Sequence, residues 1–406
     1  MAISFKHKIG CVSLVLIMIL AAHLQAQPVD TTFLGQTGRV ITTALPFLMI
    51  SPDARASGMG DIGAATKPDN HSIYWNPAKT AFLEEDFGLA VSYTPWLKKI
   101  IDDMSISYLS VYKKITREQA VGIEFKYFDL GDIMFTDQSG DDIQDFRPKE
   151  FVIGASYSRM LVENTLGIGV TARYIHSNLA GNALINNPTL DSSPANAVSA
   201  DVGVYYNKEL LLSGVNSNIA FGAVISNIGS KITYTNDDDK MFIPTNLKIG
   251  TAFTTNLDPY NSITIGLDLN KLLVPTPPIY YSDSVDSNNN PVIYKGKDPN
   301  RPLLSGIFGS FSDAPNGFKE ELQEVLVSIG GEYNYNDVFA VRMGYFWENR
   351  LKGDRKFLSF GLGFTYQVFG IDLAYLVPKN EHPLAETLRI SMVFNWEGKN
   401  SKTIKE

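Results

Sequence analysis

The chain has 406 residues, among them 35 lysines and arginines and 43 aspartates and glutamates, which gives a formal net charge of −8. An acidic chain without a run of basic residues is a poor nucleic-acid binder, so we expect no nucleic-acid partner. The single cysteine and the five histidines do not cluster, and the sequence therefore predicts no transition-metal site and no cofactor.

The chain begins with the pattern of a secretory signal peptide. Lys6 and Lys8 precede an apolar run over residues 12–22, and small Ala26 stands where cleavage is expected. The run is shorter than the roughly 20 residues that a membrane-spanning helix needs. The only cysteine, Cys11, lies before the run, whereas a lipoprotein signal places cysteine at the cleavage site. We therefore expect residues 1–26 to be removed on export.

Residues 27–86 show no strand pattern and are rich in glycine, proline, asparagine and aspartate. Gly58, Gly60 and Gly63 are spaced as in a dinucleotide-binding motif, but that motif has meaning only between a strand and a helix of a parallel α/β unit. Glycines that permit tight turns in a narrow space explain the spacing better. The segment is a candidate hatch, or plug, for the barrel that the following residues predict.

From residue 87 onward, apolar and polar residues alternate. The runs 166–174, 263–269 and 358–366 each have an apolar residue at every second position. Side chains of a β-strand point to opposite faces with period two, so each run has one apolar face and one polar face. Fourteen such runs have about the length that a tilted strand needs to cross a bilayer. They lie at about 87–96, 104–113, 118–128, 150–160, 165–176, 196–207, 217–228, 244–255, 260–270, 324–335, 337–347, 356–367, 369–377 and 386–396.

Long and short connections alternate between the predicted strands. In almost every pair the odd-numbered connection, such as 129–149, 177–195 or 271–323, is longer than the even-numbered one. Long outer loops opposite tight periplasmic turns, an even strand number and periplasmic termini are typical of bacterial outer-membrane barrels. The sequence therefore predicts an all-β fold, a 14-stranded antiparallel transmembrane β-barrel over residues 87–397. We expect it in the cell outer membrane, surrounded by lipid, with a periplasmic tail over residues 398–406.

If the apolar faces contact lipid, the opposite faces line the interior, which we expect to consist mostly of glycine, serine, threonine and charged residues. The charged residues predicted to lie inside are Glu124, Lys126, Arg173, Asp201, Lys248, Asp268, Arg342, Asp372 and Arg389. Because charges shielded from water must pair, a lumen held in shape by ion pairs is favoured over a charge-selective channel. Aromatic girdles at the two membrane interfaces are predicted from Tyr93, Trp96, Tyr174, Tyr345, Trp347, Tyr366, Tyr375, Phe394 and Trp396.

Several blocks resemble known outer-membrane proteins. The glycine-rich residues 58–65 and the sequence Asn76-Pro77-Ala78, ahead of the first strand, resemble the N-terminal hatch of FadL-like barrels, which have fourteen strands and a plug. Residues 37–55 look more narrowly like the PorV family of the Bacteroidetes type IX secretion system, and residues 92–97 and 144–148 add further matches. The likeness extends over most of the chain after the signal peptide.

The resemblance implies a non-enzymatic protein at the cell surface. PorV-like proteins receive secreted cargo, which carries a C-terminal signal domain, from the large translocon barrel SprA, also called Sov. They pass that cargo to the PorU attachment machinery, which removes the signal and links the cargo to the surface. The resemblance supplies no short catalytic or metal-binding motif that could be placed on residues of this chain.

Two other functions remain open. A FadL-like transporter of hydrophobic compounds would share the fold and the hatch, but it would need an apolar pocket beside the hatch and a lateral opening. An outer-membrane enzyme would need a catalytic arrangement, and the sequence has neither a Gly-x-Ser-x-Gly elbow nor a histidine paired with a nucleophile and an acid. We therefore expect no enzymatic activity.

The connection over residues 271–323 is far longer than an ordinary loop, and loops of this length are usually functional or disordered. Its second part is apolar, which indicates either a lid on the barrel mouth or a contact surface for a partner. The candidate contact residues are Leu303, Leu304, Ile307, Phe308 and Phe311, with Phe318 shortly after them.

Overall fold

The computed structural model describes residues 39–97, 103–136, 142–179, 193–234, 240–287, 291–379 and 387–397. The predicted signal peptide, the start of the predicted hatch and the tail over residues 398–406 lie outside the described residues. Among the helices of the described part, none is long and apolar enough to cross a membrane.

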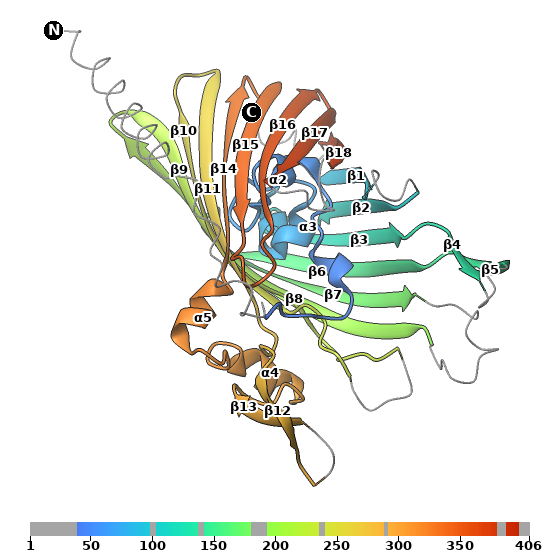
Figure 1. The fold of residues 1–406 in the computed structure, drawn as a ribbon. Helices are drawn as coiled ribbons and strands as arrows, with labels where there is room; N and C mark the ends of the chain where they lie inside the picture. Colours follow the sequence, from blue (N-terminus) through green and yellow to red (C-terminus); the bar gives the residue numbers. More distant parts are fainter. Residues whose placement is uncertain are drawn as a thin grey trace. The chain divides into compact units, whose positions relative to one another are not determined.

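Fourteen antiparallel strands form one closed barrel, in which each strand pairs with its neighbours along the chain and β1 closes the circle with β18 (Figure 1). The strands are β1 (Phe87–Pro95), β2 (Ser105–Lys114), β3 (Gln119–Asp129), β6 (Lys149–Val162), β7 (Leu166–Asn178), β8 (Ala195–Leu212), β9 (Val215–Gly229), β10 (Asn246–Asn256), β11 (Asn261–Leu272), β14 (Leu326–Tyr335), β15 (Phe339–Trp347), β16 (Lys356–Tyr366), β17 (Phe369–Pro378) and β18 (Leu388–Trp396). The predicted 14-stranded barrel is confirmed, and each predicted strand corresponds to one of these.

The β8–β9 hairpin is longer than the sequence pattern predicts. Residues 208–216 were expected to connect two strands, but they continue the β8–β9 pairing down to Leu212 and Val215. Only Ser213 and Gly214 form the turn, both with positive φ. The predicted loop is therefore wrong, because the sequence around residue 208 loses its alternation while the backbone pairing continues.

The two ends of the barrel differ. We call the end at which β11 finishes and β14 begins the long-loop end, and the opposite one the short-turn end. The long-loop end carries two small hairpins, β4 (Ile133–Thr136) with β5 (Asp142–Phe146) and β12 (Ile279–Val285) with β13 (Pro291–Lys295). It also carries two short helices, α4 (Leu303–Gly309) and α5 (Phe318–Gln323) (Figure 1). The connections 129–149 and 271–323 are therefore partly regular structure, not simple loops.

Alternation along the strands separates the two faces of the wall. On β16, Leu358, Phe360 and Leu362 are exposed, whereas Ser359 and Gly361 are buried. The charged residues predicted to lie inside are covered, with Lys248 the least so. The faces of the barrel wall are thus as predicted.

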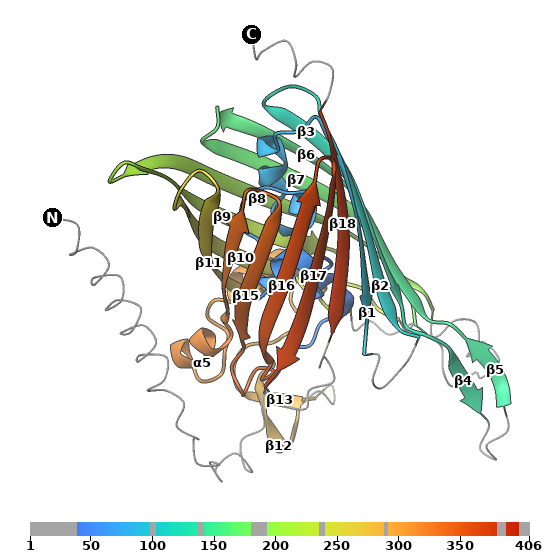
Figure 2. The ribbon, with the colours of Figure 1, turned by 90° about the horizontal axis from the view of Figure 1, so that it is seen from above.

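The segment from Arg39 to Asp86 fills the barrel interior. It contains the 3₁₀ turns η2 (Pro46–Met49) and η3 (Pro77–Phe82) and the helical turns α2 (Ala54–Gly58) and α3 (Ser72–Trp75). The strands surround these turns in both views (Figures 1 and 2). The α2 turn begins at Asp53, whose carboxylate accepts a hydrogen bond from Ala56 N at 2.8 Å and caps the helix. The expected N-terminal plug is confirmed as part of the fold.

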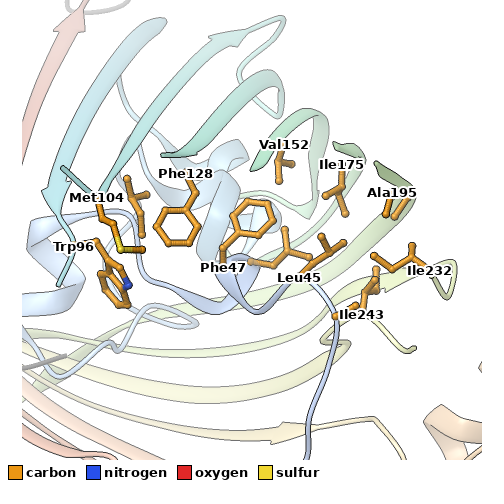
Figure 3. Packing of buried hydrophobic residues seen from close by; sticks show 14 residues of the cluster. Leu45, Phe47, Trp96, Met104, Phe128, Val152, Ile175, Ala195, Ile232 and Ile243 are labelled. Carbon is orange, nitrogen blue, oxygen red and sulfur yellow. The ribbon is translucent and has the colours of Figure 1, made fainter. Parts of the chain in front are cut away.

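An apolar cluster lies inside the barrel near the long-loop end (Figure 3). Leu45 and Phe47 of the plug segment pack there against Phe128, Ile175 and the end of the wall. Trp96 belongs to the same cluster and is buried, so its predicted place in an interfacial girdle is wrong. Trp96 follows the last residue of β1, where the period-two pattern no longer decides which way a side chain points. Trp396 does lie on the outer surface, beside Phe87.

Candidate functional site

The plug lies against glycines of the barrel wall. A methyl group added at Gly330 would come within 2.1 Å of Met59 O, and one at Gly344 within 2.0 Å of Gly60 N. Gly222 allows an equally close approach of Ala64 O. Real side-chain carbons do not come this close to other atoms, so these wall positions admit only glycine while the plug is in place. The wall is shaped to the backbone of this plug.

The glycines and the Asn-Pro-Ala sequence that indicated a hatch are part of this contact. Gly58 lies against Gly361, and Gly60, with φ of 74°, occupies the left-handed conformation beside β15. Gly63 leaves room for the ring of Trp75. The glycine spacing therefore serves turns and close packing, as the sequence suggested. These glycines do not lie between a strand and a helix of a parallel α/β unit.

Asn76, Pro77 and Ala78 attach the second half of the plug to the wall. Asn76 Nδ2 donates to Ala64 O and to Val204 O, both at 3.0 Å, while its carbonyl accepts from Ala78 N at 3.1 Å. A side chain at Gly169 would collide with the backbone of Pro77 and Ala78. One asparagine thus ties two plug turns to β8.

Charged side chains of the wall also hold the plug. Asp268 accepts hydrogen bonds from Gly63 N at 2.7 Å and Ala64 N at 3.0 Å. Lys126 Nζ donates to Phe47 O at 2.8 Å, and Lys248 Nζ lies 4.1 Å from the ring centre of Trp75. These contacts satisfy backbone groups that would otherwise be buried without partners. The plug is therefore fixed by polar contacts as well as by shape.

Ion pairs on the inner face of the wall join strands that are neighbours or are separated by one strand. Arg173 lies between Glu124, at 2.5 Å, and Asp201. Arg342 lies in the same way between Glu332, at 2.6 Å, and Asp372, at 2.5 Å. All six side chains are largely buried. The expected ion pairing of the interior charges is confirmed for both groups.

A cavity of about 380 Å³ remains between the plug and the long-loop end. Apolar residues contribute much of its lining, namely Phe47, Leu48, Trp75, Trp96, Phe128, Val152, Phe346, Phe357 and Leu376. Lys126, Lys248, Arg355 and Arg389 add positive charge. The expectation that glycine, serine, threonine and charges make up most of the interior is therefore wrong for this end, because plug residues supply apolar surface that strand alternation does not reveal.

Helix α5 is bound to the barrel mouth through its acidic face. Lys352 Nζ donates to Glu320 and Glu324, at 2.8 Å each, and Lys271 Nζ donates to Glu324 at 2.6 Å and to Glu321 at 2.9 Å. Arg39 Nη2, at the start of the plug segment, donates to Glu320 at 2.7 Å. Burial alone would raise the pKa of Glu320, but the hydrogen bonds from Arg39 and Lys352 outweigh it and lower that pKa to about 2.

The opposite face of the two loop helices is apolar and exposed. The side of α4 that carries Gly306 and Ile307 is buried, with Ile307 only 5% exposed and Gly306 packed on Phe242. With this buried side, α4 covers the β9–β10 connection. Phe308 is 73% exposed and Phe318 76%. We call the exposed set the loop patch; it consists of Leu304, Phe308, Phe311, Phe318 and Leu322.

The five candidate contact residues are thus divided between the two roles that the sequence left open. Leu304, Phe308 and Phe311 face solvent, Leu303 is partly covered and Ile307 is buried. Phe318 and Leu322, on α5, extend the exposed set. The sequence does not indicate Leu322, because α5 has only six residues and is too short to show a helical apolar pattern.

Within the described ranges, no group of three or more histidine, cysteine, aspartate or glutamate side chains is arranged to hold a metal ion. The carboxylates of α5 are paired with lysines and an arginine instead. The candidate functional features of the described residues are the plugged lumen, the cavity between the plug and the long-loop end, and the loop patch.

Comparison with known proteins identifies one family. The sequence model of one protein family, the type IX secretion system protein PorV, matches residues 34–279, which is more than half of the chain. No curated protein matches the chain.

Three solved structures among those similar to the chain are a toluene transporter, a monoaromatic hydrocarbon channel and a FadL homologue. The Pseudomonas putida toluene transporter TodX is 11% identical and has a TM-score of 0.45, with 85% of this chain and 96% of that chain covered. The CymD monoaromatic hydrocarbon channel is 13% identical with a TM-score of 0.44, covering 86% and 99%. A Pseudomonas aeruginosa FadL homologue is 12% identical with a TM-score of 0.42, covering 89% and 100%.

Proposed function

The chain belongs to the PorV family of type IX secretion system proteins and is a β-barrel of the outer membrane, and from this premise we propose that it hands over secreted cargo at the cell surface. In this role it receives proteins that bear a C-terminal signal domain from the translocon barrel of the SprA, or Sov, type. It then delivers them to a PorU-type attachment complex. The role is non-enzymatic: the chain binds and releases its partners.

The filled lumen supports handover outside the barrel. The plug is part of the same chain, it contacts wall glycines too closely for any side chain, and Asp268, Lys126 and Asn76 hold it by hydrogen bonds. A polypeptide crossing the lumen would have to displace all of these contacts together. We therefore assign cargo handling to the surface of the long-loop end.

The loop patch is the observation that carries the proposal. Large apolar side chains left facing water mark contact surfaces, because burying each of them against a partner contributes roughly 1.5–3 kcal/mol. Phe308 and Phe318 are each almost three-quarters exposed, although ion pairs and Ile307 fix the helices that carry them. A rigid, exposed apolar surface is suited to binding another protein with little ordering cost.

The test replaces Phe308 and Phe311 by serine in the native cells. Because both side chains are exposed, the double variant should assemble normally in the outer membrane. Loss of two aromatic contacts should weaken co-purification of the translocon and cargo about tenfold or more and reduce cargo on the cell surface. Lys319→Ser, a change of an exposed polar residue on α5, is the matched control and should have no effect.

If the double variant assembles and both readouts equal those of the control, the loop patch is not the docking element. If assembly fails, Phe318→Ser alone, at the most exposed position of the patch, repeats the test with a smaller change. The proposal is also contradicted if the variant yields less assembled barrel but each assembled barrel binds its partners as well as the wild type does.

The cavity beside the plug favours one second function, a FadL-like transporter of hydrophobic compounds. Its apolar lining, which includes Trp96 and Phe128, could hold such a compound. Purified protein in liposomes, tested for uptake of a labelled fatty acid, separates the two functions. Cargo handover predicts no uptake above protein-free liposomes, whereas uptake that Trp96→Ala abolishes would support the transporter.

A further inference from the structure

The plug segment runs through the barrel from one end to the other. At its start, Arg39 forms an ion pair of 2.7 Å with Glu320 of helix α5. Ala44 N donates to Phe242 O, in the β9–β10 connection, at 2.9 Å. Both partners belong to the long-loop end, and Leu45 and Phe47 pack into the apolar cluster just inside it (Figure 3).

The other end of the segment lies at the short-turn end. Phe82 packs against Tyr205, with ring centres 5.0 Å apart, in the half of β8 that leads to its turn. Lys114 Nζ, at the end of β2, donates to Leu83 O at 3.0 Å, and Lys114 N donates to Asp86 O at 2.8 Å. From there the chain enters β1 directly.

The middle of the segment contacts the wall between these two ends. Ala54 N donates to Ser391 Oγ at 2.9 Å, Gly63 N donates to Asp268, and Asn76 donates to Val204 O. Within the lumen the segment turns back once, because Tyr74 OH donates to Leu48 O at 3.0 Å and to Ile50 O at 3.1 Å, but it enters at the long-loop end and leaves at the short-turn end. The segment is a continuous thread through a wall whose fourteen strands are all paired.

From this path we infer that residues 39–45 lie on the outer side of the outer membrane, whereas β18 ends on the periplasmic side. Long loops of outer-membrane barrels face outward and tight turns face the periplasm. The start of the plug therefore shares the cell surface with the loop patch, and Arg39 joins the two through Glu320.

Threading limits how the plug can move. To leave toward the periplasm, it would have to draw Leu45 and Phe47 through the lumen and break the Arg39–Glu320 ion pair. A partner outside the cell, in contrast, can reach residues 39–42 beside α5 without entering the barrel. We call residues 39–45 the strap. A surface partner that affects the plug would thus act through the strap.

Single cysteines test the inference. The sequence has one cysteine, Cys11, in the predicted signal peptide, so a cysteine added elsewhere would be the only thiol after its removal. Val40→Cys places the thiol on the strap, where the side chain is 47% exposed. Lys319→Cys marks α5 at the long-loop end, and Tyr260→Cys, at a 61% exposed position, marks the turn between β10 and β11.

Intact cells are treated with a polyethylene-glycol maleimide of about 5 kDa, too large to cross the outer membrane, and the modified fraction is read as a gel shift. The inference predicts that Val40→Cys is modified as fully as Lys319→Cys, and that Tyr260→Cys is modified only after lysis. It is overturned if Val40→Cys behaves as Tyr260→Cys does, which would support the periplasmic N-terminus expected from the loop pattern. Modification of all three variants in detergent shows that each thiol can react, and the yield of each variant in the outer membrane shows that the barrel assembles.

Discussion

At the scale of single residues, two sets of buried charges in this barrel form groups in which one guanidinium lies between two carboxylates. Arg173 between Glu124 and Asp201 is the most enclosed example. Removing one partner of a buried ion pair leaves the other charge without compensation, which costs about 3–5 kcal/mol. Here two carboxylates would remain.

Arg173→Met should therefore lower the free energy of unfolding by about 3–5 kcal/mol, because methionine keeps the volume but not the charge. Denaturant titration of the barrel in detergent micelles measures this. Arg147, which pairs with Asp129 and is half exposed, provides the control, and Arg147→Met should have a far smaller effect. If the two variants lose the same free energy of unfolding, burial of the Arg173 ion pairs adds nothing to stability.

A second prediction at this scale concerns two adjacent glycines of β14. Gly330→Ala would place a methyl group 2.1 Å from Met59 O and should displace the plug, lowering stability and exposing the plug to protease. Gly331→Ala points away from the plug, where the nearest atom would be Thr264 O at 3.5 Å, and it should be neutral. Thermal unfolding and limited proteolysis of both variants decide the matter. A neutral Gly330→Ala would mean that the plug can shift without cost.

Sequence alternation predicts which side of the wall a residue occupies, and it does so well at this scale. Glu124, Arg173 and Arg342 are inside because each lies an even number of positions from other inward residues on a continuous strand. Trp96 shows the limit of the method. It comes just after β1, and contacts with the plug segment, which sequence spacing does not contain, turn it inward.

At the scale of elements, the long strands could be predicted and the short pieces could not. Each barrel strand is long enough to show several periods of alternation. Helices α4 and α5 have seven and six residues, too few for a helical pattern, and short helices depend on tertiary contacts for stability. For α5 those contacts are ion pairs with Lys271, Lys352 and Arg39, which are distant in sequence.

This dependence predicts a response of α5 to acid. The pKa of Glu320 is lowered to about 2 against an ordinary value near 4.5, so its stabilising effect is complete above about pH 4.5 and is lost as the pH falls toward 2. A fluorophore on Lys319→Cys should keep a high anisotropy at pH 6 and lose it between pH 4.5 and 2.

A fluorophore on Tyr260→Cys, in a turn without such ion pairs, is the control, and its anisotropy should change little over the same range. Glu320→Gln should give the low anisotropy already at pH 6, because the neutral amide keeps the shape but not the charge. If the Lys319 label stays immobile at pH 2 in the wild type, hydrogen bonds of the neutral acid or apolar contacts hold α5 instead.

At the scale of the whole molecule, the sequence predicts a plugged barrel but not the path of the plug. Glycine-rich residues 58–65 and the Asn76-Pro77-Ala78 sequence indicate a segment that packs closely. The direction in which it crosses the lumen follows from pairs such as Arg39–Glu320 and Asp268–Gly63, which join residues more than two hundred positions apart. Such pairs leave no periodic signal.

The proposed function rests on family membership and structure together. Family membership assigns the chain to type IX secretion, while the filled lumen and the loop patch support the proposal that it binds partners at the surface. A barrel used as a conduit would have to empty its lumen, and the contacts of the plug oppose this. The central claim is therefore that the assembled, plugged barrel binds secreted cargo.

The most direct test is affinity purification of the tagged protein from the native outer membrane, with quantitative mass spectrometry of what co-purifies. Proteins with the C-terminal signal domain, together with the translocon, should be enriched over a purification of the Phe308→Ser, Phe311→Ser variant at equal barrel yield. Equal recovery of cargo with and without the two aromatic residues would contradict docking at the loop patch. Absence of any such cargo from the wild-type purification would contradict the central claim itself.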